Sequence, residues 1–169
     1  MPKAARVAVL VNPANASTTK TILRDVREAA DAVGLQIHIL NGSTIGEIDA
    51  AFATLARERF DALFVAADPF FTSRRVQFAT LATRDKIPTI YSNRDYVAAG
   101  GLIGYGTDTL ERFRQIGVYT GSILKDAKPA DLPVVQSTKF ELIINAQTAR
   151  ALGLTIPETL LATADEVIQ

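Results

Sequence analysis

The strongest constraint on the fold is an alternation between short apolar runs and segments with helical spacing. The first run, Arg6–Asn12 (RVAVLVN), is rich in β-branched residues and ends at Pro13, which is typical of a buried parallel strand. The next segment, Thr18–Val33, repeats apolar residues at near-helical spacing and stops at Gly34, a residue that favours helix ends. Strand followed by helix in this way predicts an α/β fold.

The same alternation runs through the rest of the chain. Further strands are expected at Gln36–Leu40, Ala62–Ala66, Thr89–Tyr91, Leu102–Tyr105 and Phe140–Asn145. Further helices are expected at Ile45–Arg59, Ser73–Arg84, Leu110–Leu124, Ala146–Leu152 and Pro157–Ile168. The predicted architecture is a three-layer α/β structure, in which helices cover both faces of a parallel sheet.

Composition and charge exclude several classes of function. The 169 residues include no cysteine and one histidine, which excludes disulfides and thiol chemistry and disfavours a zinc site or a histidine triad. Eighteen basic residues balance eighteen acidic ones, which argues against nucleic acid or an anionic membrane as a partner. No glycine-rich phosphate loop follows the first strand, so we predict neither a nucleotide cofactor nor a metal. No apolar run reaches the roughly 18 residues that would span a membrane.

Polar residues follow the first strand, at the edge of the sheet where α/β proteins bind ligands. Asn12, Asn15 and Ser17 lie in the segment NPANAS, which joins this strand to the first helix. Their side chains, together with the free N–H groups of the helix start, would suit a carboxylate or another anion. Alternatively, Asn15 or Ser17 only caps the helix, and both roles can hold together.

The third strand ends in Asp68, Pro69, Phe70 and Phe71. Two adjacent phenylalanines are unfavourable in water, so they either line a ligand cleft or pack against another lobe. It is equally consistent that one of them simply joins the core.

The fourth strand ends in the richest polar and aromatic cluster of the chain, Tyr91–Tyr96. It offers the donors, acceptors and rings of a small-molecule site, or else it is a solvated loop with a weak Arg94–Asp95 ion pair. Asp68 and Asp95 follow neighbouring strands and could pair, but no hydroxyl with a base and an orienting group is evident. His38 lies within a strand, which favours a partly buried sheet residue over a general base.

Longer stretches of the sequence resemble a known family. The segments are IPTIYSNRDYVAAGGLIGYGTD (87–108), the string KPADLP…KFELIIN…ARALGLTIP that follows, and the opening RVAVLVNPANASTT. They are similar to ABC transporter substrate-binding proteins of the tryptophan/tyrosine-type uptake systems, over essentially the whole chain. The resemblance implies a periplasmic-binding-protein-like (flavodoxin-like) lobe, one of two that a hinge joins around a buried ligand.

The resemblance also implies a division of the chain. Residues 1–108 would form the α/β ligand-binding lobe, and 109–169 the helix–strand–helix elements that return to or pack on the other lobe. An export signal and almost all of the first lobe are expected to be absent from this chain. Helix Leu110–Leu124 would then expose apolar area, through which we expect a homo-oligomer.

Carried over to this sequence, the ligand site of the family maps to the loops after the strands. The candidate ligand-binding residues are Asn12, Asn15, Ser17, Asp68, Phe70, Tyr91, Asn93 and Asp95. The residues of the first loop would hold a carboxylate or another polar group. Asp68 would orient a donor such as an amine. Those after the fourth strand would contact the ligand across the cleft mouth.

The leading hypothesis is a solute-binding component, or a fragment of one, in an ABC uptake transporter. It would deliver an amino acid or another small organic solute to the permease by hinge closure, with no covalent chemistry. The resemblance implies the periplasm, and because the opening residues lack a secretory signal, we expect a processed or truncated form there. The alternative, if the chain has its natural start, is the cytoplasm. Two alternatives are a stand-alone flavodoxin-like α/β enzyme and a non-binding oligomeric remnant.

Overall fold

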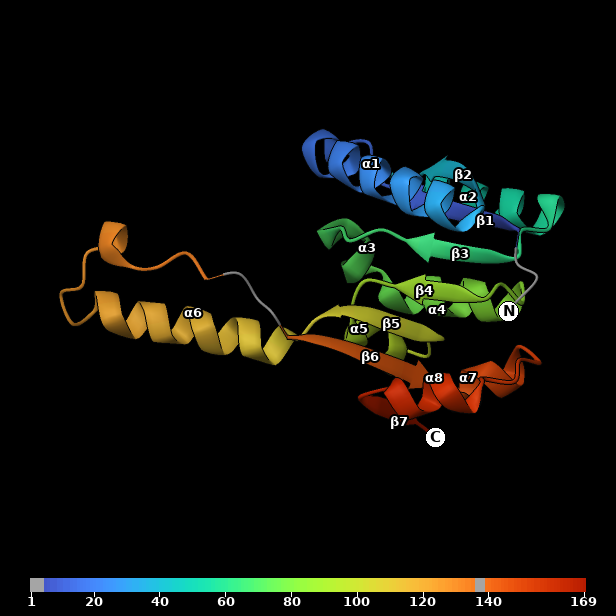
Figure 1. The fold of residues 1–169 in the computed structure, drawn as a ribbon. Helices are drawn as coiled ribbons and strands as arrows, with labels where there is room; N and C mark the ends of the chain where they lie inside the picture. Colours follow the sequence, from blue (N-terminus) through green and yellow to red (C-terminus); the bar gives the residue numbers. More distant parts are fainter. Residues whose placement is uncertain (1–4, 136–138) are drawn as a thin grey trace.

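The computed structural model describes residues 5–135 and 139–169, and it is built on a seven-stranded sheet (Figure 1). The strands are β1 (Arg6–Val11), β2 (Gln36–Asn41), β3 (Ala62–Val65), β4 (Thr89–Tyr91), β5 (Ile103–Thr107), β6 (Phe140–Asn145) and β7 (Glu166–Ile168). The helices are α1 (Ala16–Val33), α2 (Ile45–Glu58), α3 (Pro69–Ser73), α4 (Arg75–Arg84), α5 (Arg94–Ala98), α6 (Thr109–Ile123), the 3-10 helix η1 (Pro129–Asp131), α7 (Ala146–Ala151) and α8 (Glu158–Thr163).

The strand order in the sheet is β2-β1-β3-β4-β5-β6-β7. The five strands from β2 to β5 are parallel to one another, as the sequence predicted. The prediction of an all-parallel sheet is wrong at β6, which pairs antiparallel with β5. The chain leaves β5, passes through α6 and η1 beyond the end of the sheet, and returns at the same end, so β6 runs back beside β5 (Figure 1). The paired residues Thr107 and Phe140 mark this exit and return.

Helices cover both faces of the sheet, and β1 therefore has buried residues on both sides. Ala8 and Leu10 face a large core that α2, α3, α4 and α5 complete, with Phe52, Phe71 and Phe78 in its centre. On the other face, a smaller core around Val9 and Val11 is covered by α1. The prediction of a three-layer α/β structure is therefore confirmed. The larger core fixes the carboxyl ends of β1, β3 and β4 relative to one another.

Three helical segments differ from the predictions. The helix expected at 73–84 begins earlier and is broken at Arg74 into α3 and α4, because Asp68 caps a helix start with Pro69 in its first turn. The short α5 was not predicted, and Asn93 caps it. The helix expected at 157–168 is only α8, and the end of that segment forms β7 beside β6.

His38 was predicted to be partly buried, and this is wrong. The residue is exposed on the edge strand β2, where its ring lies 5.2 Å from that of Phe60. An edge strand that alternates half-buried and exposed residues places His38 on its open side.

The α6 helix leaves the sheet and projects beyond its end (Figure 1). Asp108 caps it by accepting hydrogen bonds from the N–H groups of Leu110 and Glu111, at 2.9 and 3.1 Å. None of its residues is buried. The segment after it lies back against the helix, where the Tyr119 hydroxyl donates to the Pro133 carbonyl. The first turn of α6 thus stays beside the sheet, and its remainder extends away from it.

Candidate functional site

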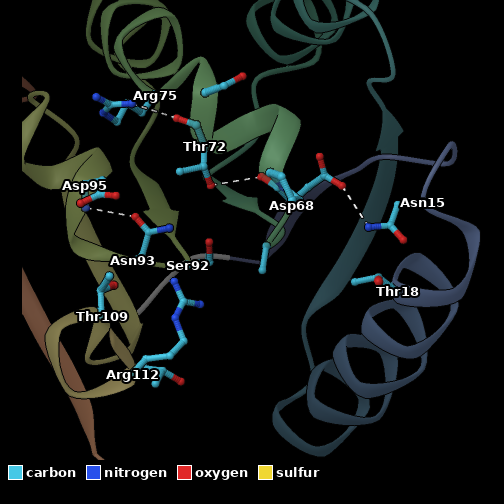
Figure 2. A pocket seen from close by; sticks show the side chains of 14 residues that line it. Asn15, Thr18, Asp68, Thr72, Arg75, Ser92, Asn93, Asp95, Thr109 and Arg112 are labelled. Carbon is cyan, nitrogen blue, oxygen red and sulfur yellow. Dashed lines mark hydrogen bonds between the residues drawn. The ribbon is translucent and has the colours of Figure 1, made fainter. Parts of the chain in front are cut away.

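A pocket of about 790 Å³ lies at the carboxyl ends of the parallel strands (Figure 2). The segments after β1, β3 and β4, the end of β5 and the first turn of α6 all contribute to its wall. The lining residues are Asn15, Thr18, Ala67, Asp68, Pro69, Thr72, Ser73, Arg75, Ser92, Asn93, Asp95, Thr107, Thr109 and Arg112. Most are polar, and the charged ones are two aspartates and two arginines. A pocket in this place is the expected ligand site of an α/β sheet.

Asp68 is held in a fixed orientation on one wall. Its side chain is buried, and its Oδ1 accepts hydrogen bonds from Asn12 Nδ2 at 3.1 Å and from the Phe70 N–H at 2.9 Å. Its Oδ2 accepts a 3.3 Å hydrogen bond from Asn15 Nδ2. These donors stabilise a carboxylate and leave acceptor capacity on Oδ2 for a ligand. Asn12, Asn15 and Asp68, which are candidates from two different loops, therefore lie in direct contact.

The interpretation of Asn15 as a helix cap is wrong, although it does occupy the N-cap position of α1. Its side chain makes no capping hydrogen bond and points across to Asp68 instead (Figure 2). Ser17 is exposed and does not line the pocket. Thr18, the next residue along α1, does line it. The pocket does lie beside the predicted segment after β1. The residue that faces it, however, is Thr18, one position after the predicted Ser17.

The opposite wall is the segment between β4 and α5. Asn93 Oδ1 accepts a 3.0 Å hydrogen bond from the Asp95 N–H and thereby caps α5. Asn93 and Asp95 both line the pocket, as predicted, and Ser92 joins them (Figure 2). Asp68 and Asp95 lie on this one pocket, but no hydrogen bond joins their side chains within the described residues.

Glycines in β5 hold that wall in place. A Cβ atom on Gly106 would lie 2.0 Å from the Ser92 carbonyl oxygen, and one on Gly104 would lie 2.7 Å from the Asn93 carbonyl oxygen. Only a residue without a side chain permits so close an approach of two backbones. The Ser92–Asn93 segment is therefore seated directly on the edge of β5.

Two aromatic residues that were predicted to contact a ligand, Phe70 and Tyr91, do not line this pocket. Phe70 does not line the pocket: it packs against the core, and the Arg74 guanidinium lies 3.9 Å from its ring centre. Tyr91 is fully buried and stacks on Tyr96, with ring centres 4.5 Å apart. Burial raises the pKa of Tyr91 above its ordinary value and raises the pKa of Tyr96 to about 12, so both phenols stay protonated. Both rings therefore pack into or against the apolar core below the strand ends instead of facing the pocket.

The first turn of α6 supplies two lining residues that sequence reasoning missed, Thr109 and Arg112. Their position depends on Asp108, whose Oδ2 lies 2.6 Å from Lys139 Nζ, at the point where the chain returns to the sheet. The hydrogen bond from Lys139, together with those from the first-turn N–H groups, lowers the pKa of Asp108 below its ordinary value. The sequence signal was available, since an aspartate after a strand and before a helical pattern predicts a cap beside the strand end. Thr72 and Arg75 were missed because the break at Arg74 was not predicted.

Within residues 5–135 and 139–169, no group of three or more His, Asp or Glu side chains is arranged to hold a metal ion. In the same ranges, no helix combines the length and apolar character that crossing a bilayer requires.

The profile of the ABC transporter substrate binding protein family matches residues 1–168. The chain belongs to this family. A tyrosine-binding protein from Clostridioides difficile strain R20291 is 26% identical over 153 residues, which are 90% of this chain and 44% of that protein. The chain thus spans about half the length of the relatives it matches.

Solved structures of other proteins match the fold of this chain. A crystal structure described as the ABC domain in complex with L-Trp, from Streptococcus pneumoniae, is 27% identical, with a TM-score of 0.89 over 99% of this chain and 56% of that one. A conserved domain protein from Vibrio cholerae is 24% identical, with a TM-score of 0.88 over the same shares of the two chains. The ligand-free, open structure of a substrate-binding protein with adhesive properties from Clostridium difficile has a TM-score of 0.71, with 24% identity, over 99% of this chain and 55% of that one. The family match confirms the predicted family, and the solved structures confirm the predicted fold class.

Proposed function

We propose that this chain binds a small organic solute, an amino acid or a molecule of similar size and charge, as part of an ABC uptake system. The carrying observation is the 790 Å³ pocket at the carboxyl ends of the strands, which has both acidic and basic groups on its wall. That volume lies within the range of about 300–1,000 Å³ that is usual for small-molecule sites. The names of two relatives, one tyrosine-binding and one in complex with L-Trp, support an amino acid.

In this proposal, Asp68 accepts a hydrogen bond from the ammonium group of the solute. It is buried and held by Asn12 and Asn15, so a charged donor in the pocket meets a carboxylate that needs no rearrangement. Asn93 and Asp95 contact the solute at the mouth. Ser17, Phe70 and Tyr91 have no contact role, since they do not line the pocket.

We further propose that residues 1–108 act as one lobe and that the outer part of α6 packs on a second lobe of the family fold. The apolar side chains of Leu110, Phe113 and Leu124 are exposed along this helix, which needs a covering surface. The chain spans about half the length of its relatives, so a lobe of that size is available in the family as the cover. Closure of the two lobes would complete the site. The closed form would then deliver the solute to a permease from outside the cytoplasm, with no covalent step.

Native mass spectrometry of gently purified protein, followed by calorimetric titration with the proteinogenic L-amino acids, tests this proposal. We expect at least one amino acid to bind, and Asn15→Ala to weaken its binding several-fold, because Asp68 loses one of its supporting hydrogen bonds. Asn41→Ala is the control, since Asn41 is exposed at the end of β2 and does not line the pocket. Absence of binding across the whole set would contradict the proposal for this chain. The same spectra report the number of copies, and a dimer would instead support self-association through α6.

A further inference from the structure

The pocket wall has an unusual composition for a chain whose relatives are associated with aromatic amino acids. Among the described lining residues no side chain is aromatic, because Phe70, Phe71, Tyr91 and Tyr96 all pack into or against the core. Hydroxyl, amide and charged groups make up most of the wall. This wall is suited to the charged end of a solute rather than to a ring.

The Ser92 hydroxyl forms no hydrogen bond within the described residues. Its Oγ is buried, with no hydrogen-bond partner in the described part of the chain, although the residue lines the pocket. Unsatisfied buried hydroxyls are uncommon in folded proteins, because they lose the hydrogen bonds that water would supply. The backbone beside this hydroxyl is closely packed, since a Cβ atom on Gly106 of β5 would lie 2.0 Å from the Ser92 carbonyl oxygen. The hydroxyl therefore stays available to a bound acceptor.

Arg112 supplies a charge directed at the same place. Its side chain rises from the first turns of α6 and points toward the strand-end segment that carries Ser92 (Figure 2). Within the described residues it forms no ion pair, and its nearest acidic neighbour in sequence, Glu111, is 3.5 Å from Arg114. By contrast Arg75, the other arginine of the wall, donates to the Thr72 carbonyl at 3.4 Å. The Arg112 guanidinium also lies 5.6 Å from the ring centre of Phe113.

The backbone of the first turn of α6, which carries Arg112, is held in place relative to the sheet. Asp108 caps the helix start, and its Oδ2 lies 2.6 Å from Nζ of Lys139, the residue that directly precedes the return strand β6. The Asp108 N–H also donates to the Lys139 carbonyl at 3.0 Å. Arg112 is therefore placed over the pocket by the same contacts that join α6 to β5 and β6.

We propose that Arg112 and the Ser92 hydroxyl form an anion subsite that binds the carboxylate of the solute, with Asp68 receiving its ammonium group on the opposite wall. This inference rests on the proposed function and narrows it to solutes that carry a carboxylate. A guanidinium and a hydroxyl can each donate to carboxylate oxygens, and a charge-assisted bond of this kind becomes stronger as water leaves the site. The two aspartates and two arginines of the wall balance, as a zwitterionic ligand requires.

The test is a titration of the full ¹⁵N-labelled chain with L-tyrosine and with tyramine, which lacks the carboxylate, followed by NMR. We expect L-tyrosine to shift the signals of Ser92, Asn93 and Arg112. Arg112→Gln should weaken L-tyrosine binding about tenfold or more and leave tyramine binding unchanged. Ser92→Ala should weaken L-tyrosine binding by a smaller factor. Arg114→Gln is the control, since Arg114 lies on the same helix, outside the pocket.

The outcomes separate the two proposals. If neither compound shifts a pocket signal and calorimetry finds no other proteinogenic amino acid that binds, the proposed function fails, and the anion subsite fails with it. If L-tyrosine shifts the pocket but Arg112→Gln leaves its affinity unchanged, or tyramine binds equally well, only the anion subsite is overturned. A loss of affinity in Arg75→Gln without one in Arg112→Gln would also overturn it and would assign the carboxylate to the other arginine.

Discussion

The sheet body, residues 5–107 and 140–169, and the α6 arm, residues 108–135, are built on opposite principles. In the body, helices press large side chains such as Phe52, Phe71 and Phe78 into a core where they are fully buried. In the arm, α6 buries none of its residues, and Leu110, Phe113 and Leu124 are 70%, 60% and 80% exposed. The body obtains its stability from tertiary packing, and the arm relies on local helix signals.

This difference bears on function as well as on stability. A helix of 15 residues is marginal by itself in water, so the arm needs its cap at Asp108 and a contact elsewhere. Its first turn contributes to the pocket, whereas its outer turns present apolar side chains with no partner in the described chain. The contacts of a solute bound between the body and the arm would therefore depend on the orientation of the arm. Closure of a binding site requires a dependence of this kind.

The largest expected contrast is in stability. Phe71→Ala should lower the free energy of unfolding by about 3–5 kcal/mol, because it leaves a cavity in the core. Phe113→Ala, the same change on the arm, should alter it by less than about 0.5 kcal/mol. Urea denaturation followed by circular dichroism measures both. Equal losses would show that α6 is buried in solution, for example in a dimer, and native mass spectrometry of the two variants would then identify the assembly.

Much of the body could be predicted from sequence, since its strands are short β-branched runs and its helices have clear periodicity. The errors lie where a local signal competes with tertiary context. The chain 157–168 looked helical throughout, yet its end adds β7 to the exposed edge of β6. The direction of β6 could not be read from its pattern, because parallel and antiparallel buried strands have the same apolar sequence.

The site was predicted at the level of loops rather than of residues. Asn12, Asn15 and Asp68 meet because parallel strands end at one edge of the sheet, which sequence order alone implies. Whether a ring faces the pocket or the core depends on packing, and this reversed the expectation for Phe70 and Tyr91. Ser17 was predicted to line the site and does not, and Arg112 lines the pocket but was not predicted. In both helices, a single position decides which side chain faces the pocket.

Two glycine-to-alanine substitutions, one in the body and one in the arm, compare how closely the backbone is packed in these two regions. Gly106→Ala should destabilise the protein by about 1–3 kcal/mol, because the new Cβ would meet the Ser92 carbonyl, and should also weaken solute binding by moving that wall. Gly117→Ala lies in the middle of α6 with nothing within 4 Å of the new Cβ, and should stabilise the helix by about 0.5–1 kcal/mol. Thermal unfolding and helical ellipticity distinguish the two. Tolerance of Gly106→Ala with unchanged binding would contradict the seating of Ser92 on β5.

Acid should loosen the arm through Asp108. The pKa of this carboxyl is lowered below the ordinary value of 3.8, chiefly by the hydrogen bond from Lys139, so its stabilising contribution is present above that value and is lost as the pH falls through the lowered pKa. We expect the amide signals of Leu110 and Glu111 to move with this titration. In Asp108→Asn, which keeps a capping oxygen, the acid step should disappear. Asp61→Asn is the control in the body, where backbone N–H groups of Arg6 and Ala5 lower the pKa of Asp61. Persistence of the step in Asp108→Asn would assign it to another group.

The smallest expected effect on stability lies at the junction of body and arm. Its pH dependence is opposite to that of Asp108, because the stabilising contribution is lost as the pH rises. Glu141 in β6 is buried, with Oε2 3.3 Å from Arg94 Nη1 and with Oε1 lacking a hydrogen bond within the described residues. Burial raises its pKa above the ordinary value of 4.5, so its contribution to folding is most favourable at low pH and declines as the pH rises from 4.5 through the raised pKa.

Glu141→Gln removes this titration while keeping the shape of the side chain. Because burial raises the pKa of Glu141, the stability of the variant relative to the wild type should be higher at pH 7 than at pH 4. Urea denaturation at the two pH values measures the difference, with Glu166→Gln as control, since Glu166 is the other acceptor of Arg94 and is exposed on β7. A relative stability that is lower at pH 7 would mean that the Arg94 ion pair outweighs the unfavourable burial of the charge. The joint from which the arm extends would then be held by a favourable ion pair rather than strained by a buried acid.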